Sequence, residues 1–244
     1  MKTAVITGSS RGIGYETALR LARDGWSLAL HYNKSAAEAR GLCQRIRSMG
    51  CDAEIFPADV ADRQAVFSLR DAVNARFGPP QLLVCNAGVA QQKLFTDITD
   101  DDWQRMIGVD LSGVFYCCQA FLPAMISRKS GRIITLSSIW GIQGASCEVH
   151  YSAAKAGVIG LTRALAQEAG PSGVTVNCVA PGVIDTEMCA HLDDRDRAEL
   201  CGQIPLGRLG AAREVAEVVA FLASDSAGYL TGQVISPNGG MVLV

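Results

Sequence analysis

The sequence carries little charge, and neither sign dominates. Charged residues make up 19% of its 244 residues, and the formal net charge is -2. Proteins that bind nucleic acids usually present a strongly basic surface, so no nucleic-acid partner is expected. Long apolar runs are also missing, because the longest are about as long as one strand and a membrane helix needs roughly 20 residues. No membrane span is therefore expected.

Cysteine and histidine lack the spacing of a metal site or a disulfide framework. The nine cysteines are odd in number and include no Cys-x-x-Cys pair, and the three histidines do not cluster with them. A zinc site needs clustered ligands, so no metal is predicted. The N-terminal segment reaches Gly8 too early for a signal peptide, which favours a cytoplasmic location with reduced cysteines.

Linkers, repeats and low-complexity tracts are absent as well, which favours one domain over residues 1–244. Short apolar runs predict strands at 3–7, 27–32, 53–57, 82–85, 133–137, 175–179 and 233–236. Amphipathic stretches predict helices at 12–24, 35–49, 63–76, 101–128, 151–169 and 211–223. Strands without polar alternation are typical of sheets buried on both faces. The sequence therefore predicts an α/β protein, a single Rossmann-type doubly wound parallel sheet of about seven strands with helices on both faces.

The segment 181–210 breaks this alternation and contains a charged cluster at 193–197. Long insertions at the carboxyl end of such sheets are often functional, and ligands bind at that end. Residues at about 185–210 are therefore interpreted as a substrate lid. The alternative is a structural crossover without ligand contacts.

A glycine-rich turn directly follows the first expected strand. It contains Gly8, Ser10, Arg11, Gly12, Ile13 and Gly14. Gly8 would allow a tight turn, Gly12 a close backbone approach to a pyrophosphate, and Gly14 close packing of the next helix. That helix would offer free N–H groups to the phosphates. Three such glycines are a weak signal alone, but between a first strand and a first helix they predict a dinucleotide site.

The end of the second expected strand lacks the acid that usually binds the ribose hydroxyls of NAD. Asn33, Lys34 and Ser35 stand there instead, and Arg11 adds a second cation. Cations without a carboxylate suit a 2′-phosphate, so the sequence favours NADP(H). The alternative is that Lys34 only starts an exposed helix.

Two further segments are expected to contact the cofactor. Asp59 and Val60 follow the third strand, where the Asp59 carboxylate could accept from the adenine amino group or, alternatively, cap the next helix. Asn86, Ala87 and Gly88 end the fourth strand. Their small side chains would leave room for a ribose or a ring.

Tyr151 and Lys155 lie four residues apart at the start of an expected helix, and this spacing places them on one face. An ammonium group there favours the tyrosinate and lowers the pKa of Tyr151 from about 10. Tyr151 could then exchange a proton with a substrate, and Ser138, after the fifth strand, could hydrogen-bond the substrate oxygen. A Tyr-xxx-Lys pair alone would indicate only an amphipathic helix. Together with the glycine-rich turn and Ser138, it predicts a catalytic site.

These residues together resemble the short-chain dehydrogenase/reductase family over essentially the whole chain. The resemblance is carried by residues 7–14, Asp59, 86–88, Ser138, Tyr151, Lys155, Pro181, Gly182, Thr186 and 232–240. Within the family the chain is most similar to bacterial 3-oxoacyl-(acyl carrier protein) reductases.

The resemblance implies a Rossmann domain and a homotetramer built on the long central helices and the C-terminal region. It implies that Tyr151 donates the proton, that Lys155 tunes it and binds the nicotinamide ribose, and that Ser138 orients the carbonyl. The nicotinamide would be lined by Pro181, Gly182, Ile184 and Thr186.

The chain departs from the family pattern at Asp110, where the family usually has an asparagine that holds a water in the proton relay to the lysine. If the backbone carbonyl does this, Asp110 could serve unchanged. If the side chain matters, an anion near Lys155 would keep the ammonium charged and offset part of its pull on Tyr151. We therefore expect Asp110 to act in a working but altered relay with a shifted pH optimum.

The substrate rim is expected to include Trp140, Gln143, Gly144, Glu148, His150 and Met188. Glu148 could receive a cationic amine or be an ordinary solvated residue. The segment 140–151 is similar to a branch that reduces an aminopentanone on a lysine of elongation factor P. Acyl carrier proteins are acidic, and Arg128 and Lys129 could receive one beside the cleft, although Ser172 stands where such reductases often have another basic residue.

The favoured function is reversible, NADPH-dependent reduction of a 3-oxoacyl-thioester-like carbonyl to a secondary alcohol. The partner would be a small-molecule or carrier-bound substrate, with acyl carrier protein as a candidate. One alternative is reduction of the 5-aminopentanone group on elongation factor P. The other is a non-catalytic NADP(H)-binding sensor or scaffold.

Overall fold

The central sheet has seven strands in the computed structural model, which describes residues 2–187 and 193–243. These strands are β1 (Thr3–Ile6), β2 (Ser27–Tyr32), β3 (Ala53–Pro57), β4 (Leu82–Cys85), β5 (Gly131–Leu136), β6 (Val174–Val179) and β9 (Val234–Ile235). Their order is β3-β2-β1-β4-β5-β6-β9, and every neighbouring pair is parallel. The predicted Rossmann-type doubly wound sheet is therefore confirmed.

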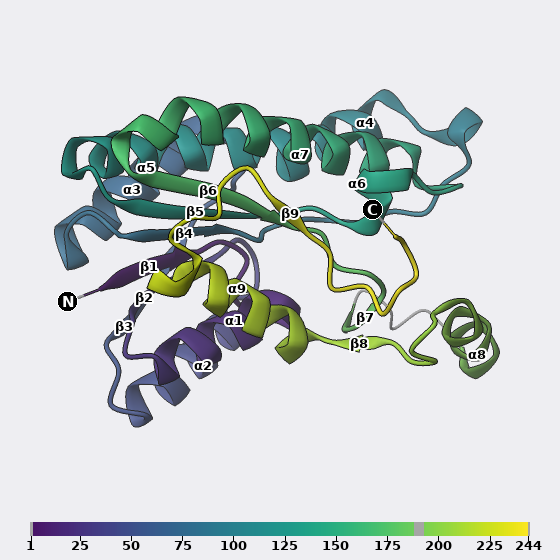
Figure 1. The fold of residues 1–244 in the computed structure, drawn as a ribbon, viewed down its shortest axis with the longest axis horizontal. Helices are drawn as coiled ribbons and strands as arrows, with labels where there is room; N and C mark the ends of the chain where they lie inside the picture. The colour runs from purple at the N-terminus through teal and green to yellow at the C-terminus, as the bar shows by residue number, and fades with distance from the viewer. Residues whose placement is uncertain (1, 188–192, 244) are drawn as a thin grey trace.

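Helices cover both faces of this sheet (Figure 1). One face carries α1 (Gly12–Arg23), α2 (Ala36–Ser48) and α9 (Ala212–Ala223). The other face carries α3 (Arg63–Phe77), α4 (Asp100–Ile107), α5 (Gly113–Arg128) and α7 (Val149–Ala169). Successive side chains of a strand point to opposite faces, so Ala4 and Ile6 of β1 join one buried core and Val5 joins the other. This explains why the strands show no polar alternation.

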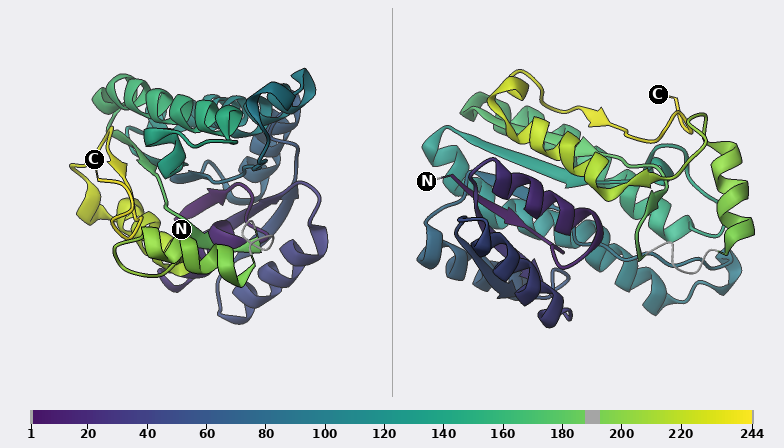
Figure 2. Two further views of the ribbon diagram at one scale, coloured as in Figure 1. Left: turned by 90° about the vertical axis from the view of Figure 1, so that its right-hand side faces the viewer. Right: turned by 90° about the horizontal axis from the view of Figure 1, so that it is seen from below.

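The strand order reverses direction at β1, and this reversal determines where the candidate functional residues lie. β1 lies between β2 and β4, and the chain leaves β1 and β4 toward opposite faces (Figure 2). Ligands of such sheets bind in the crevice beyond the carboxyl ends of the strands at this point. The glycine-rich turn follows β1, and Asn86 follows β4, so both border this crevice.

The predicted helix at 101–128 is divided in the structure. α4 passes through a π-helical turn, Gly108–Ser112, into α5. Such turns inside α-helices often occur at functional sites, and this one carries Asp110. By length and composition, 100–128 is the one described helical stretch that could cross a membrane, but half of its most apolar window is buried within the fold. A core helix can pass the same test of length and composition, so this stretch is weak evidence for a membrane span.

The segment 181–210 contains short elements that the sequence did not indicate. β7 (Ile184–Asp185) pairs with β8 (Gly210–Ala211), and α8 (Asp194–Gln203) lies between them in the chain. Arg197 of α8 donates to Asp185 at 2.9 Å. α6 (Ile139–Gln143), after β5, was not expected either. β7, β8 and α6 are too short to leave a clear periodicity in a sequence, and α8 has no buried face that would give it an apolar pattern.

Candidate active site

The glycine-rich turn has the backbone geometry that its glycines suggested. Gly8 and Gly12 adopt φ values of +64° and +56°, which disfavour any residue with a side chain. A Cβ on Gly14 would lie 2.5 Å from Asn86 Nδ2 and press against the Gly8 carbonyl. α1 begins at Gly12, and no side chain caps it. Its first N–H groups are therefore available to a phosphate.

His31 holds this turn in place, a role that sequence reasoning missed. Its Nδ1 accepts from Gly8 N–H at 3.0 Å, and its Nε2 lies 3.1 Å from the Ala58 carbonyl, to which it donates. Burial lowers the pKa of His31 to about 4, so the ring is neutral near neutral pH. The available signal was a histidine near the end of the apolar strand that pairs with the strand before the glycine-rich turn.

Asn86 joins the ends of β1 and β4. Its Nδ2 donates to the Thr7 and Gly8 carbonyls, both at 2.9 Å. The Thr7 hydroxyl accepts in turn from the N–H groups of Asn86 at 2.9 Å and Ala87 at 3.0 Å. Ala87 also lies close to Gly8, because a Cβ added to Gly8 would be 2.8 Å from the Cα of Ala87. The side chain of Asn86 is thus used for architecture.

The candidate residues for a 2′-phosphate lie at the surface beside this turn. Asn33 and Lys34 are exposed after β2, and Ser35 precedes α2 without capping it. Within residues 2–187 and 193–243, Lys34 makes no ion pair, whereas Arg11 Nε lies 3.9 Å from Glu187 Oε2. Both cations are therefore accessible to an anion.

Asp59 and Val60 have different surroundings. Asp59 is exposed and accepts from Ala61 N–H at 3.0 Å. The N-cap of α3 is Asp62, so the alternative that Asp59 caps this helix is wrong. Val60 is buried against Gly113, where a Cβ would lie 2.9 Å from its Cγ2.

The structure brings Ser138, Tyr151 and Lys155 together at the carboxyl end of β5. Ser138 caps α6 by accepting from Trp140 N–H at 3.2 Å, and its hydroxyl favours the ionised form of Tyr151. Lys155 Nζ lies 5.5 Å from the centroid of the Tyr151 ring and donates to the Leu136 carbonyl at 3.2 Å. Lys155 and Tyr151 are therefore close together, as their helical spacing suggested, and Ser138 adjoins them from the end of β5.

Asp110 belongs to the same cluster. Its Oδ2 lies 2.9 Å from Lys155 Nζ, and its Oδ1 accepts from Val89 N–H at 2.8 Å. A Cβ on Gly88 would be 2.8 Å from Asp110 Oδ2 and 3.3 Å from Lys155 Nζ. The tripeptide 86–88 thus contacts the glycine-rich turn at one end and the Lys155 cluster at the other.

Burial and charge shift the ionisation of this cluster. Burial raises the pKa of Tyr151, Lys155 lowers it and Asp110 raises it, and the net direction is upward. Burial lowers the pKa of Lys155, but the charges of Asp110 and Tyr151 outweigh burial and raise it overall. Burial also raises the pKa of Asp110 against the effect of Lys155. Lys155 does lower the pKa of Tyr151, as expected, but the predicted net decrease is wrong because burial and Asp110 raise this pKa by more.

Comparisons with known proteins agree with this arrangement. Residues 8–242 match a family model described as Enoyl-(Acyl carrier protein) reductase. The 3-oxoacyl-[acyl-carrier-protein] reductase FabG of Staphylococcus aureus is 42% identical over 242 residues, which cover 99% of this chain and 98% of the relative. The proteins of the same name from Pseudomonas aeruginosa and Salmonella typhimurium are each 40% identical, over 99% and 100% of this chain and 98% of each relative.

The chain belongs to the short-chain dehydrogenase/reductase family. The predicted family resemblance is thereby confirmed. As a family member, the protein is an NADP(H)-dependent oxidoreductase that acts on CH–OH and C=O groups. The matched family description names an enoyl substrate, whereas the relatives' names give a 3-oxoacyl substrate.

The expected rim of this short-chain dehydrogenase/reductase is only partly formed by the predicted residues. Trp140 is half-buried in α6, whereas Gln143 and Gly144 are exposed at its end. Glu148 is half-buried before α7, and Gln92 Nε2 lies 3.5 Å from its Oε1. Met188 lies outside the described residues.

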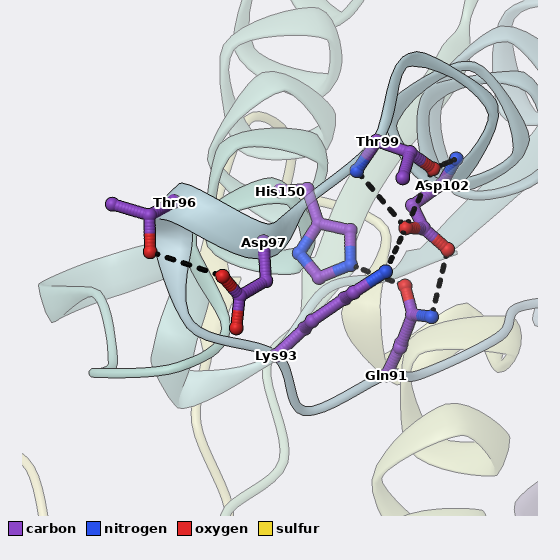
Figure 3. Close-up of polar contacts among 7 residues, drawn as sticks. All are labelled: Gln91, Lys93, Thr96, Asp97, Thr99, Asp102 and His150. Atoms are coloured by element: carbon purple, nitrogen blue, oxygen red, sulfur yellow. Dashed lines mark hydrogen bonds and ion pairs between the residues drawn. The ribbon is translucent and has the colours of Figure 1, made fainter.

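His150 lies behind the rim rather than on it. It is fully buried, and its Nε2 lies 2.9 Å from Gln91 Oε1 (Figure 3). Gln91 Nε2 donates to Asp102 at 2.8 Å, and Lys93 Nζ contacts the other carboxylate oxygen at 2.6 Å. This network ties the loop after β4 to α4 and α7. No sequence motif marks Gln91, Lys93 or Asp102, so sequence reasoning did not identify them.

Arg128 and Lys129 are far from the cleft of their own chain. The Arg128 guanidinium donates to the carbonyls of Pro79 at 3.2 Å and Pro80 at 2.7 Å, just before β4. Both residues precede β5, at the amino ends of the strands, whereas Ser138 follows the carboxyl end of β5. Their predicted position beside the cleft is therefore wrong within one chain. The sequence placed both residues near a strand but did not show that they lie at the end of the sheet opposite the cleft.

Proposed function

We propose that this protein reduces a 3-oxoacyl group, carried as a thioester, to the 3-hydroxyacyl group with NADPH. The observation that carries the proposal is the cluster of Ser138, Tyr151 and Lys155 beside the glycine-rich turn. The substrate class is supported by relatives named 3-oxoacyl-[acyl-carrier-protein] reductase that match nearly the whole chain. Acyl carrier protein is the proposed partner.

The residues at the crevice fit a dinucleotide. The positive φ values of Gly8 and Gly12 and the uncapped start of α1 form a cradle for a pyrophosphate. When bound, NADPH supplies the hydride. The proposed contacts are Gly8, Ser10, Arg11, Gly12, Ile13, Gly14, Asn33, Lys34, Ser35, Asp59, Val60, Asn86, Ala87, Gly88, Tyr151, Lys155, Pro181, Gly182, Ile184 and Thr186. Arg11 and Lys34 would pair with the 2′-phosphate.

The chain's own residues would handle the oxygen and the proton. Ser138 donates a hydrogen bond to the substrate carbonyl and so orients it. Tyr151, held protonated by burial, delivers its phenolic proton to the same oxygen as charge develops there. Lys155 stabilises the phenolate left behind. The proton would return through the Lys155 side chain and the adjoining Asp110.

Several further properties of the protein belong to this proposal. Residues 1–244 would act as one domain, with 185–210 as a substrate lid. Trp140, Gln143, Gly144, Glu148 and Met188 would be the substrate-pocket residues, with the buried His150 directly behind them. We expect a cytoplasmic homotetramer, assembled through the central helices and the C-terminal region. Relatives that match nearly the whole chain support the single domain.

The test is loss of NADPH absorbance with an acetoacetyl thioester, free and carrier-bound, with NADH in parallel. We expect turnover with NADPH, and a loss of at least a hundredfold in kcat for Tyr151→Phe with NADPH binding retained. Retained turnover in Tyr151→Phe would contradict the assigned role. Binding of NADPH without any turnover would favour a non-catalytic sensor or scaffold.

A second candidate substrate is the 5-aminopentanone group on a lysine of elongation factor P. The observation that favours it is Glu148, a half-buried carboxylate near Tyr151. Its charge raises the pKa of Tyr151, although burial, Lys155, Asp110 and Ser138 each affect that pKa more strongly. A carboxylate there would attract a cationic amine. Turnover of an aminoketone that falls in Glu148→Gln, with no turnover of acetoacetyl thioesters, would establish this candidate.

A further inference from the structure

Asp110 is a buried carboxylate placed directly on the catalytic lysine. It is 0% exposed, and the Lys155 side chain beside it is also buried. The π-helical turn Gly108–Ser112 presents Asp110 toward α7, and the Val89 N–H fixes its other oxygen at 2.8 Å. Its Oδ2 makes no aligned hydrogen bond among the described residues, so the ammonium at 2.9 Å is what balances its charge.

Lys155 therefore has two possible anionic partners, and Asp110 is the one to which it makes an ion pair. Lys155 Nζ lies 2.9 Å from the carboxylate but 5.5 Å from the centroid of the Tyr151 ring. The Leu136 carbonyl, at 3.2 Å, is a third, neutral acceptor. Gly88 packs directly against this ion pair, because a Cβ added to Gly88 would contact both Asp110 and Lys155.

Other titratable groups face this cluster from each packed element. His150 of α7 favours the ionised form of Asp110, and Glu148 before α7 disfavours ionisation of Tyr151. The Cys178 thiol of β6 faces Lys155. The Ser138 hydroxyl favours the tyrosinate. Within residues 2–187 and 193–243, Asp110 is the carboxylate that makes an ion pair with Lys155.

We propose that Asp110 is a positioning residue that takes Lys155 as its own counter-ion and thereby keeps Tyr151 a protonated donor well above neutral pH. The inference rests on the proposed role of Tyr151 as the proton donor. It predicts that the protein reduces carbonyls across neutral pH, where the donor is loaded. It also predicts that alcohol oxidation, which needs the tyrosinate as base, proceeds well only in alkaline solution.

The physical reason is that one ammonium cannot fully stabilise two anions in a site of low dielectric. With Asp110 ionised, forming the Tyr151 phenolate would place a second negative charge beside the same lysine. With a neutral residue at position 110, the phenolate would be the only anion in contact with Lys155. The pKa directions agree, because burial and Asp110 both raise the pKa of Tyr151.

The experiment is a direct titration of Tyr151 by the near-ultraviolet absorbance of tyrosinate, in the protein and in Asp110→Asn. Subtracting the same titration of Tyr151→Phe in each background isolates the one phenol. We expect Asp110→Asn to move the titration of Tyr151 to lower pH by about one to three units. An unchanged titration would overturn the inference. Because no substrate is used, this result is independent of whether the proposed substrate is correct.

A matched control is Glu148→Gln, which removes a charge that is not in contact with Lys155 and should move the titration less. Equal shifts in the two variants would show a general field rather than a counter-ion and would also overturn the inference. If Asp110→Asn fails to fold, Asp110→Ser keeps an acceptor for the Val89 N–H in a neutral side chain and gives the same comparison. With a working substrate, the pH limb of oxidation should shift by the amount measured in the titration.

Discussion

His31 Nδ1 accepts a hydrogen bond from the backbone N–H of Gly8 at 3.0 Å, and this contact fixes the turn that follows β1. A protonated imidazole carries hydrogen on both nitrogens and could not accept there. The contact therefore requires the neutral ring. The fold around the cofactor turn depends on an imidazole that stays uncharged.

The stability of the protein should therefore fall in acid through His31. Burial lowers the pKa of His31 from 6.5 to about 4 in the folded protein. The unfolded chain then binds more protons between these values, so stability is lost as the pH falls through this window. Below it, both states are protonated and this group has no further effect. The loss amounts to about 3 kcal/mol, measurable by urea unfolding at a series of pH values.

His31→Gln is the control for this prediction, because glutamine has no charge to gain. The variant should be less stable at neutral pH and should lose less stability between pH 6.5 and 4 than the unaltered protein. Parallel pH profiles for the two proteins would contradict the assignment to His31.

Gly14→Ala should damage the cofactor site although it adds only one methyl group. The new Cβ would lie 2.5 Å from Asn86 Nδ2 and against the Gly8 carbonyl. We expect a loss of about 1–3 kcal/mol in the free energy of unfolding and weaker NADPH binding. Gly41→Ala is the matched control, because a Cβ on this helical glycine meets nothing within 4 Å. It should stabilise the protein by about 1 kcal/mol. Equal behaviour of the two variants would contradict the packing argument.

Sequence patterns predicted the parts of the fold that depend on local periodicity. The strands of the sheet and the glycine-rich turn appear where apolar runs and glycine spacing indicated them. Tyr151 and Lys155 share a helix face because helical spacing requires it. These features follow from interactions between residues near in sequence.

The remaining features depend on contacts between distant segments. The π-helical turn that carries Asp110 packs against α7 and leaves no local signal, so the apolar pattern predicted one helix at 101–128. His150 looked like a rim residue because it precedes Tyr151, yet Gln91 holds it inside. The net pKa of Tyr151 depends on burial and on Asp110, which no spacing along α7 could show.

Discrimination between NADPH and NADH should depend on Lys34 and Arg11. Both are exposed beside the glycine-rich turn, and Lys34 has no ion pair within the described residues. A hydrogen bond to a charged phosphate is worth about 1.5–3 kcal/mol, so Lys34→Ala should raise KM for NADPH about ten- to a hundredfold. The KM for NADH should not change.

Lys129→Ala removes the same charge at the opposite end of the sheet and is the control. It should leave KM for both cofactors unchanged. An equal rise in KM for NADH in Lys34→Ala would mean that Lys34 does not read the phosphate. Arg11→Ala should act in the same direction and, in addition, remove the contact with Glu187.

Gln91→Leu should remove the contact that holds the loop after β4 against α7, the helix that carries Tyr151 and Lys155. The change preserves side-chain size but removes the bonds to His150 and Asp102 (Figure 3). The buried His150 Nε2 then has no partner, which costs about 1–3 kcal/mol in the free energy of unfolding. Because His150 precedes Tyr151 on α7, we expect kcat to fall while KM for NADPH stays constant. Gln92→Leu is the adjacent control, since the one side-chain hydrogen bond of this exposed residue within the described part of the chain is the long 3.5 Å contact with Glu148. If Gln92→Leu lowers stability and kcat as much as Gln91→Leu does, the buried network is not what positions α7.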